Sequence, residues 1–500
     1  MRKTCISFLL FLSMAAAFGQ ETCHIVSDRS HYTAGERLFC AVTALSGTGS
    51  SVSSLSGVAY VGLYSAEGLE SGAKVELIDG HGGGEMMLPK TLPTGNYLLV
   101  AWTKAGGQCD QARVISVYNT GSNLRTGQVE IVSGIETGSL SVVTEESDRA
   151  DIMFDESATV SVSLIRDCGL PEYLPIACGR IVAPGNAEPD GETISVRISG
   201  NENYEGLEAF LAVPGSDELY SAPIGRDGIV CFKSQNIHGH KDVAFVIGKD
   251  DQVGNYEISL EQPFAASLNL AVPPMLLSES LEDRIAELGN TGLDTLSDVF
   301  PTRKPAFLYG DKEIRFSYIL DDYTRFPTMR ETFIEFVSDI RARKEDGKTD
   351  IRVRFRDNSG ANYLFDRKRS LTLLDGVPVF NQQLIYDYDP ALVKRIDVYR
   401  GVYFMGNNFF RGIANFVTFE GTLPGFVFGS DVKILEFDGV SPVRSYGAGH
   451  ETLYWNPLVR LEAGQPLQIS LPEGAEGQFI LNVEGFTDSG KAVHRRIILK

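Results

Sequence analysis

One short pattern in this sequence could support ester chemistry. His81 precedes three glycines, Gly82 to Gly84, and a His-Gly-Gly-Gly run can build the oxyanion hole of an esterase. That chemistry also needs a Gly-x-Ser-x-Gly nucleophile elbow, which the sequence does not contain. Because the flanking residues indicate a hairpin, the pattern predicts a turn and not a catalytic loop.

Two further patterns carry ionisable side chains. His238 and His240 flank Gly239, but two histidines without a third ligand favour a solvated loop over a metal site. Asp321 and Asp322 are adjacent, and neighbours on a strand point to opposite faces, so they would not share a substrate. With no HExxH pattern and no P-loop either, the sequence predicts a protein that is not an enzyme and needs no metal or cofactor.

The cysteines suit an exported chain. The first 19 residues read as a signal peptide, with Arg2 and Lys3 before an apolar run and cleavage near Gly19. Six cysteines follow it, and an even number permits disulfides. We expect one to three, with Cys168–Cys178 as a loop closure and Cys40–Cys109 as an intradomain tie. Buried free thiols are the alternative. The six are Cys23, Cys40, Cys109, Cys168, Cys178 and Cys231.

Net charge and hydropathy limit the possible partners and the cellular location of the protein. The net charge of −20 argues against nucleic acid and against anionic membrane surfaces as partners. After the signal peptide, the sequence has no apolar run long enough for a membrane-spanning helix. We expect the protein to be located in the periplasm or at the periplasmic face of the outer membrane, with the cell surface as the alternative.

Most of the chain alternates apolar and polar residues at strand spacing. In residues 20–120, Ala59, Val61 and Leu63 alternate with their neighbours, and Asp79–Gly80 is a turn signal. Residues 150–270 repeat this pattern and predict a second β-sandwich. Residues 271–320 read as a linker with a short helix from Ser278 to Leu288, and residues 430–500 return to sandwich spacing.

The first block contains two distinctive stretches, HYTAGERLFC from His31 to Cys40 and GGGEMMLPKTLPTGNYLLVAWT from Gly82 to Thr103. Through them it resembles the macroglobulin-like β-sandwiches of exported Bacteroidetes proteins. The C-terminal block resembles the same proteins in ETLYWNP, from Glu451 to Pro457, and in LPEGAEGQFILNV, from Leu471 to Val483. The resemblance implies a mainly β, multidomain fold of macroglobulin- or immunoglobulin-like sandwiches.

Residues 321–422 change character to a small α+β unit. Thr328 and Glu331 form a capping box for a helix expected to end at Gly347, with Arg341, Arg343 and Lys344 in its last turn. Strands are expected at Ile351 to Arg356, Leu371 to Leu374, Arg395 to Arg400 (closed by Gly401) and Ile413 to Phe419, with a capped turn of helix at Asp389–Pro390.

This unit contains four distinctive stretches: LDGVP from Leu374, DPALVKRIDVYRG from Asp389, the turn at Met405–Gly406, and Gly412 to Thr418. Through them it resembles the plug domain of TonB-dependent outer-membrane receptors. The motif residues carried over are Asp375, Gly376, Pro378, Asp389, Pro390, Ile396, Val398, Gly401, Gly406 and Gly412.

The resemblance implies a role at a pore that another chain supplies. A receptor barrel needs about 22 strands of about ten residues, whereas residues 422–500 amount to 79. We therefore expect a non-enzymatic protein that caps or occupies a separately encoded outer-membrane barrel, with the type IX secretion translocon as the candidate and the sandwiches for partner binding. Expected exposed contacts, at the tip of the last turn and nearby, are Tyr386, Tyr388, Tyr403, Phe404, Phe409, Phe410 and Arg411. The alternative is a cell-surface adhesin or polymer-binding protein, with the plug-like unit as a spacer.

Overall fold

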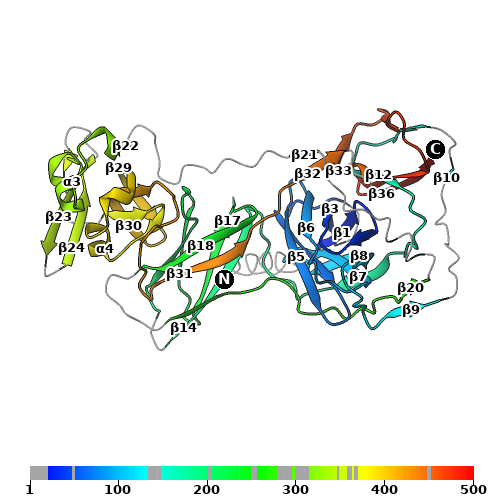
Figure 1. Cartoon of the computed structure of the whole chain (residues 1–500), viewed down its shortest axis with the longest axis horizontal. Coiled ribbons are helices and arrows are strands. Elements are labelled where there is room, and N and C mark those ends of the chain that lie inside the picture. The colour runs from blue at the N-terminus through cyan, green and yellow to red at the C-terminus, as the bar shows by residue number, and fades with distance from the viewer. Residues whose placement is uncertain are drawn as a thin grey trace, which may run out of the picture. The chain divides into compact units, whose positions relative to one another are not determined.

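A computed structural model gives the protein as two compact, mainly β units (Figure 1). Unit 1 comprises residues 1–192, 263–302 and 439–500, and unit 2 comprises residues 193–262 and 303–438. The structure describes residues 21–47, 51–132, 143–144, 148–200, 204–235, 237–248, 256–278, 281, 285, 295–298, 315–345, 348–356, 363–364, 370–447 and 452–500. The expected signal peptide lies outside these residues, as does most of the helix expected from Ser278.

The first sandwich of unit 1 is built from a nine-stranded sheet whose main path has the strand order β5-β4-β7-β8-β1-β3-β6, and β2 pairs with β8 off this path. Tyr60, Leu63 and Trp102 are fully buried in its core, and β4 is buried on both faces rather than alternately. The strands are β1 (Glu21–Ser27), β2 (His31–Thr33), β3 (Arg37–Ser46), β4 (Val58–Tyr64), β5 (Leu69–Glu76), β6 (His81–Met87), β7 (Gly95–Trp102) and β8 (Gln108–Tyr118).

The other sheet of unit 1 collects strands from distant parts of the chain, in the order β10-β36-β35-β12-β33-β32-β21. They are β10 (Val143–Thr144), β12 (Ala158–Arg166), β21 (Thr295–Asp298), β32 (Arg444–Gly447), β33 (Thr452–Leu461), β35 (Phe479–Thr487) and β36 (Ala492–Leu499). Two further strand pairs lie outside this sheet, formed by β9 (Val129–Ile131) with β20 (Met275–Leu277) and by β11 (Arg149–Ile152) with β34 (Leu467–Ser470). Strand β13 (Ile176–Arg180) belongs to the first sheet, where it pairs with β8.

Unit 2 contains a sandwich of two sheets. One has the order β17-β14-β19 and the other β16-β15-β18-β31. Its strands are β14 (Glu192–Ser199), β15 (Glu208–Ala212), β16 (Leu219–Pro223), β17 (Ile229–Ser234), β18 (His240–Ile247), β19 (Glu257–Leu260) and β31 (Val432–Asp438).

An α+β layer completes unit 2, built on a sheet of order β22-β29-β30-β27-β28. Its elements are β22 (Arg315–Ile319), η2 (Leu320–Asp322), α3 (Met329–Glu335), β23 (Ile340–Glu345), β24 (Lys348–Val353), β25 (Phe355–Arg356), β26 (Tyr363–Leu364), β27 (Leu371–Leu374), β28 (Val377–Pro378), α4 (Gln382–Tyr386), η3 (Pro390–Leu392), β29 (Val393–Met405) and β30 (Asn408–Thr418).

The sheet containing β15 is buried on both faces. Successive side chains of a strand point to opposite faces, and Leu211 enters the core of the sandwich whereas Phe210 and Ala212 enter the core of the α+β layer. The α+β layer therefore shares its hydrophobic core with the sandwich and is not a separate domain on a linker.

These pairings correct the expected domain boundaries. Strand β12 pairs with β33 and β35, so residues 158–166 belong with the C-terminal strands and not with the second sandwich. Conversely, β31 pairs with β18, which places residues 432–438 in unit 2. Strand β22, expected in the linker, is an edge strand of the α+β sheet. Long-range strand pairing, which local alternation does not encode, decides all three.

Three local expectations are also wrong. Helix α3 ends at Glu335, and the basic residues expected in its last turn lie on β23, which pairs with β24. Asp321 and Asp322 lie on the 3₁₀-helix η2 and not on a strand. Gly82 to Gly84 lie inside β6, where a Cβ on Gly82 would come within 2.2 Å of the Glu76 carbonyl oxygen. The turn is at Asp79–Gly80, as its sequence indicates.

Candidate functional site

The Asp-Gly turn of the plug-like motif is a buried structural junction. Asp375 and Gly376 both have positive φ values and join β27 to β28. The Asp375 carboxylate accepts hydrogen bonds from Thr418 N and Thr418 Oγ1, both at 2.7 Å, and from Leu423 N at 2.9 Å. Its carbonyl accepts from Gly215 N of the sandwich at 2.8 Å. The motif therefore ties strand ends together and holds the α+β layer to the sandwich.

Other motif residues also have structural positions. The Asp389 side chain accepts from Ala391 N and caps η3, with Pro390 at its first position, and Pro378 lies in β28. Ile396 and Val398 are fully buried in β29. Gly401 does not close its strand as expected, because β29 continues past it through a register shift between Tyr399 and Val402. Gly412 has a φ of +82°, and a Cβ there would lie 2.5 Å from Val353.

The β29–β30 hairpin turns at Gly406 and has two unlike faces. Phe404 and Phe409 are directly opposed, with ring centroids 6.1 Å apart, and they are 78% and 36% exposed. Tyr403 and Phe410, also opposed, point to the other face and are buried in the core of the α+β layer. We call Val402, Phe404 and Phe409 the outer face of the hairpin.

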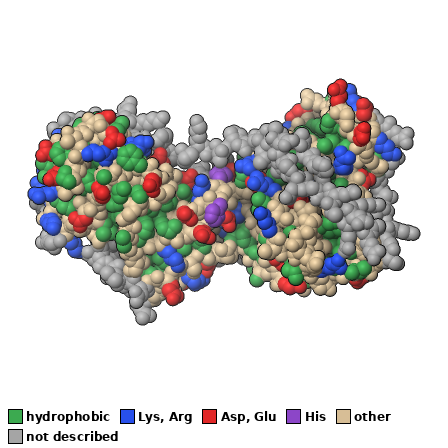
Figure 2. Space-filling model, viewed as in Figure 1, with side chains coloured by type: hydrophobic (Ala, Val, Ile, Leu, Met, Phe, Trp, Pro, Cys, Tyr) green, Lys and Arg blue, Asp and Glu red, His purple; other side chains and the backbone are tan. Residues whose placement is uncertain are grey.

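The expected partner contacts differ in exposure. Phe404 and Phe409 are exposed, whereas Tyr386 and Arg411 are half-buried. The expectation is wrong for Tyr388, Tyr403 and Phe410, which are buried. Phe409, Phe410 and Arg411 also lie on β30 rather than at the tip of the turn. Figure 2 shows hydrophobic side chains gathered over the part of unit 2 that Figure 1 labels β30.

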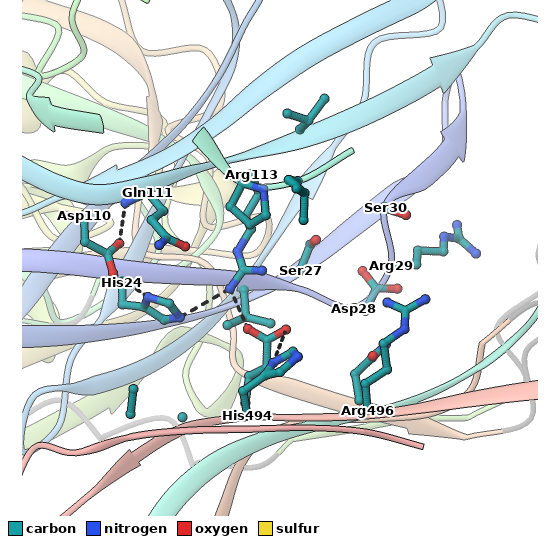
Figure 3. A pocket seen from close by; sticks show the side chains of 18 of the residues that line it. His24, Ser27, Asp28, Arg29, Ser30, Asp110, Gln111, Arg113, His494 and Arg496 are labelled. Carbon is teal, nitrogen blue, oxygen red and sulfur yellow. Dashed lines mark hydrogen bonds and ion pairs between the residues drawn. The ribbon is translucent and has the colours of Figure 1, made fainter. Parts of the chain in front are cut away.

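A charged cavity in unit 1 was not anticipated from the sequence. It has a volume of about 480 Å³ and lies between the first sandwich and strands β35 and β36 (Figure 3). His24 and Arg113 come from β1 and β8, Glu484 from β35, and His494 and Arg496 from β36. Residues 172–175 of the segment before β13 complete the wall.

Ion pairs connect the two sides of this cavity. Arg113 Nη2 lies 2.5 Å from Glu484 Oε2 and 3.3 Å from His24 Nε2. Because arginine can only donate, His24 Nε2 accepts, and His24 Nδ1 donates to Asp110 Oδ2 at 2.6 Å. Both ring nitrogens of His24 are thus engaged within the protein. This arrangement suits binding of a polar ligand better than proton transfer to a substrate.

Burial and charge set the protonation of Glu484 in the cavity and of His31, which follows the lining residue Ser30. Although burial would raise the pKa of Glu484, Arg113 and His494 lower it to about 2. Burial, with Arg29 and Arg496, lowers the pKa of His31 to about 3, so this ring is neutral at pH 7. Two buried polar atoms of residues lining the cavity, Asn482 Oδ1 and Arg496 Nε, have no hydrogen-bond partner in the described part of the chain.

The six cysteines and His240 have defined positions in the structure. Each of the six cysteines is a thiol in the structure, which corrects the expected Cys40–Cys109 and Cys168–Cys178 bonds. His240 Nδ1 lies 2.8 Å from Asp438 Oδ1 across β18 and β31. In the described ranges, His, Cys, Asp and Glu side chains form no group of three that could hold a metal ion.

None of the described helices combines the length and apolar character needed to cross a bilayer.

Sequence reasoning missed the cavity because its charged residues come from strands more than 370 residues apart. Arg113 and Glu484 are charged residues inside mostly buried strands, with Ala112 and Val114 beside the first and Val483 and Gly485 beside the second. A charged residue inside a mostly buried strand is a signal for a buried pair, but it does not identify the partner.

Comparisons with known proteins add little to this geometry. No protein-family model and no curated protein matches the chain. Among solved structures, it is similar to an Escherichia coli adhesin, FdeC, at 11% identity over 52% of this chain and 65% of that one, with a TM-score of 0.16. It is also similar to trypsin-activated α2-macroglobulin from Escherichia coli, at 10% identity over 97% of this chain and 24% of that one, with a TM-score of 0.17.

A third similar structure is dimeric latent PorU from Porphyromonas gingivalis, at 9% identity over 96% of this chain and 34% of that one, with a TM-score of 0.16. The chain spans less than two thirds of the length of each of these three proteins. At such TM-scores the likenesses carry no argument about function. The mainly β, multidomain architecture rests on the sheets themselves.

Proposed function

We propose that the chain is a non-enzymatic binding protein whose α+β layer contacts a separately encoded outer-membrane β-barrel through the outer face of the β29–β30 hairpin. The observation that carries this proposal is the two-faced hairpin, with Phe404 78% exposed opposite Phe409. Exposed aromatic side chains are typical anchors of protein interfaces. The choice of a barrel as partner rests on the resemblance of residues 321–422 to plug domains.

The hairpin is held in a way that suits this role. Its inner face packs into the shared core, and the backbone N–H of Asn407 bonds to Glu208 of the sandwich. The outer face is thus presented on a rigid support, which reduces the entropy lost on binding. Burying one large aromatic side chain at an interface would contribute about 1.5–3 kcal/mol.

The test uses the full-length chain as bait in detergent extracts of outer membranes from the source organism. A β-barrel protein, identified by mass, should co-purify, and the type IX secretion translocon is the specific candidate. The double change Phe404→Ser and Phe409→Ser should abolish capture. Val427→Ser, which alters another exposed apolar residue of unit 2, is the matched control and should leave capture intact. Capture that survives the double change, or that contains no barrel, would overturn the proposal.

A second candidate function is favoured by the charged cavity. In a cell-surface adhesin or polymer-binding protein, this cavity would take a charged or amide-bearing group of the polymer, because Arg496 Nε and Asn482 Oδ1 offer a donor and an acceptor. Binding to arrayed surface polymers that is lost in Arg496→Gln and kept in the hairpin double variant would favour this function. The reverse pattern would exclude it.

A further inference from the structure

The thiols of Cys109 and Cys178 meet across strands β8 and β13. The two strands are antiparallel, with Cys109 paired to Gly179 and Gln111 paired to Ala177. Cys178 packs against the hydrophobic core cluster that contains Cys109, and the Cys109 thiol hydrogen-bonds to the sulfur of Cys178. Cys109 Sγ also lies 3.2 Å from the Gln111 carbonyl oxygen, so its single proton can be directed to either acceptor.

The two sulfurs differ in exposure and acidity. Cys109 is buried, at 1% exposure, whereas Cys178 is half-buried. The hydrogen bond from Cys109 lowers the pKa of the Cys178 thiol below its ordinary value, and the same bond together with burial raises the pKa of Cys109. Since the thiolate is the attacking species in disulfide exchange, the accessible cysteine is also the more reactive one.

Cys178 lies in the segment that closes the charged cavity. Three residues before it, Glu172 to Pro175 form part of the cavity wall, and Glu172 Oε2 accepts from Arg496 Nη2 at 2.7 Å. Ten residues after it, Glu188 accepts from the hydroxyl of Tyr60 at 2.9 Å. Cys178 lies between these two contacts. A covalent bond from Cys178 to β8 would therefore fix the segment that carries the cavity wall to the first sandwich.

We propose that Cys109 and Cys178 are a redox pair that closes to a disulfide by exchange with an external disulfide and thereby fixes the wall of the charged cavity. In the first step the Cys178 thiolate attacks the incoming disulfide, forms a mixed disulfide and releases one thiolate. In the second step Cys109 loses its proton, attacks the Cys178 sulfur and releases the second thiol. Two protein thiols are oxidised and one external disulfide is reduced to two thiols.

The test treats the reduced full-length protein with oxidised glutathione, traps remaining thiols with a maleimide and maps non-reduced peptides by mass. The expected result is the loss of two thiols per chain and one cross-linked peptide joining Cys109 to Cys178. Cys109→Ser should accumulate glutathione on Cys178, because the resolving thiol is absent. Cys178→Ser should leave Cys109 reduced, and Cys231→Ser, at an exposed site elsewhere, should leave the cross-link unchanged.

A second measurement addresses the cavity wall. Hydrogen exchange in residues 172–175 should slow by about tenfold or more on oxidation, because a cross-link restricts local opening. Cys178→Ser should show no such change. A cross-link from Cys109 to Cys23, its neighbour on β1, or from Cys178 to Cys168 would overturn the proposal, as would unchanged exchange in the oxidised protein.

Discussion

The backbone N–H of Asn407 points at the carboxylate of Glu208, whose oxygens lie 3.2 and 3.0 Å from the nitrogen. Asn407 lies in the turn of the β29–β30 hairpin with Gly406, and Glu208 begins β15 in the sandwich, where it is 2% exposed. A buried carboxylate needs such partners. The contact therefore holds the turn of the hairpin against the sandwich and leaves its outer face in solvent.

Gly406 is required by this contact. Its φ is +58°, and a Cβ there would lie 1.5 Å from Glu208 Oε1. Gly406→Ala should cost about 1–2 kcal/mol in backbone strain and a further 1–3 kcal/mol, roughly, for displacing the carboxylate. Gly239→Ala is the matched control, because Gly239 has a φ of +66° with nothing within 4 Å of a Cβ.

The measurement for this pair should be hydrogen exchange of β29–β30 peptides, since both tryptophans of the chain, Trp102 and Trp455, belong to unit 1 and do not report on unit 2. Gly406→Ala should lower protection of the hairpin well beyond Gly239→Ala. Equal effects of the two changes would mean that the contact with Glu208 contributes nothing to the protection of the hairpin.

Asp375 should be among the most sensitive positions of unit 2. Asp375→Ala leaves the buried N–H groups of Thr418 and Leu423 without an acceptor, each at about 1–3 kcal/mol, at a position with a φ of +48°. Asp375→Asn should be milder, because asparagine tolerates this conformation and retains one oxygen. Thermal unfolding monitored by circular dichroism checks the order of the three proteins, and an alanine variant as stable as the asparagine variant contradicts it.

The two faces of the hairpin should respond differently to truncation. Tyr403→Ala removes a buried ring and should destabilise unit 2 by about 3–5 kcal/mol, whereas Phe404→Ala removes an exposed one and should change stability by about 0.5 kcal/mol or less. Hydrogen exchange of β29 peptides compares these adjacent residues directly. A large loss of protection in Phe404→Ala would show that its face is covered within the monomer.

Unit 1 should lose stability in acid through Glu484. The folded-state pKa of Glu484 is about 2, below its ordinary value of 4.5, because Arg113 and His494 outweigh burial. A depressed carboxyl pKa stabilises the fold above pH 4.5, and this contribution, about 3 kcal/mol, is lost as the pH falls from 4.5 to 2. Urea unfolding followed by tryptophan fluorescence at pH 5 and pH 2 measures it.

Glu484→Gln should flatten this pH dependence. Glu462→Gln is the control, because Glu462 pairs with Arg460 at the surface, with 58% of its side chain exposed. If the wild-type protein and Glu484→Gln lose equal stability between pH 5 and pH 2, the Arg113–Glu484 pair does not make the proposed contribution.

Local features of the α+β layer could be read from the sequence because short-range chemistry determines them. Thr328 caps α3 by accepting from Glu331 N, and Asp389 caps η3, as their side chains and spacing indicate. The turn at Asp375–Gly376 also follows from residues that tolerate positive φ. The end of α3 could not be read, because Ile340 continues the helical spacing of the apolar residues although residues 340–345 form a strand that pairs with β24.

The sequence by itself determined that this is a mainly β protein and where its turns and caps lie, since alternation and capping act over a few residues. Only the tertiary structure decided which strands pair, that Arg113 meets Glu484 across a cavity, and that Phe404 and Tyr403 have opposite environments. These outcomes depend on contacts between residues far apart in the chain. A strand's pattern says that one face must be covered, but its pairing decides what covers it.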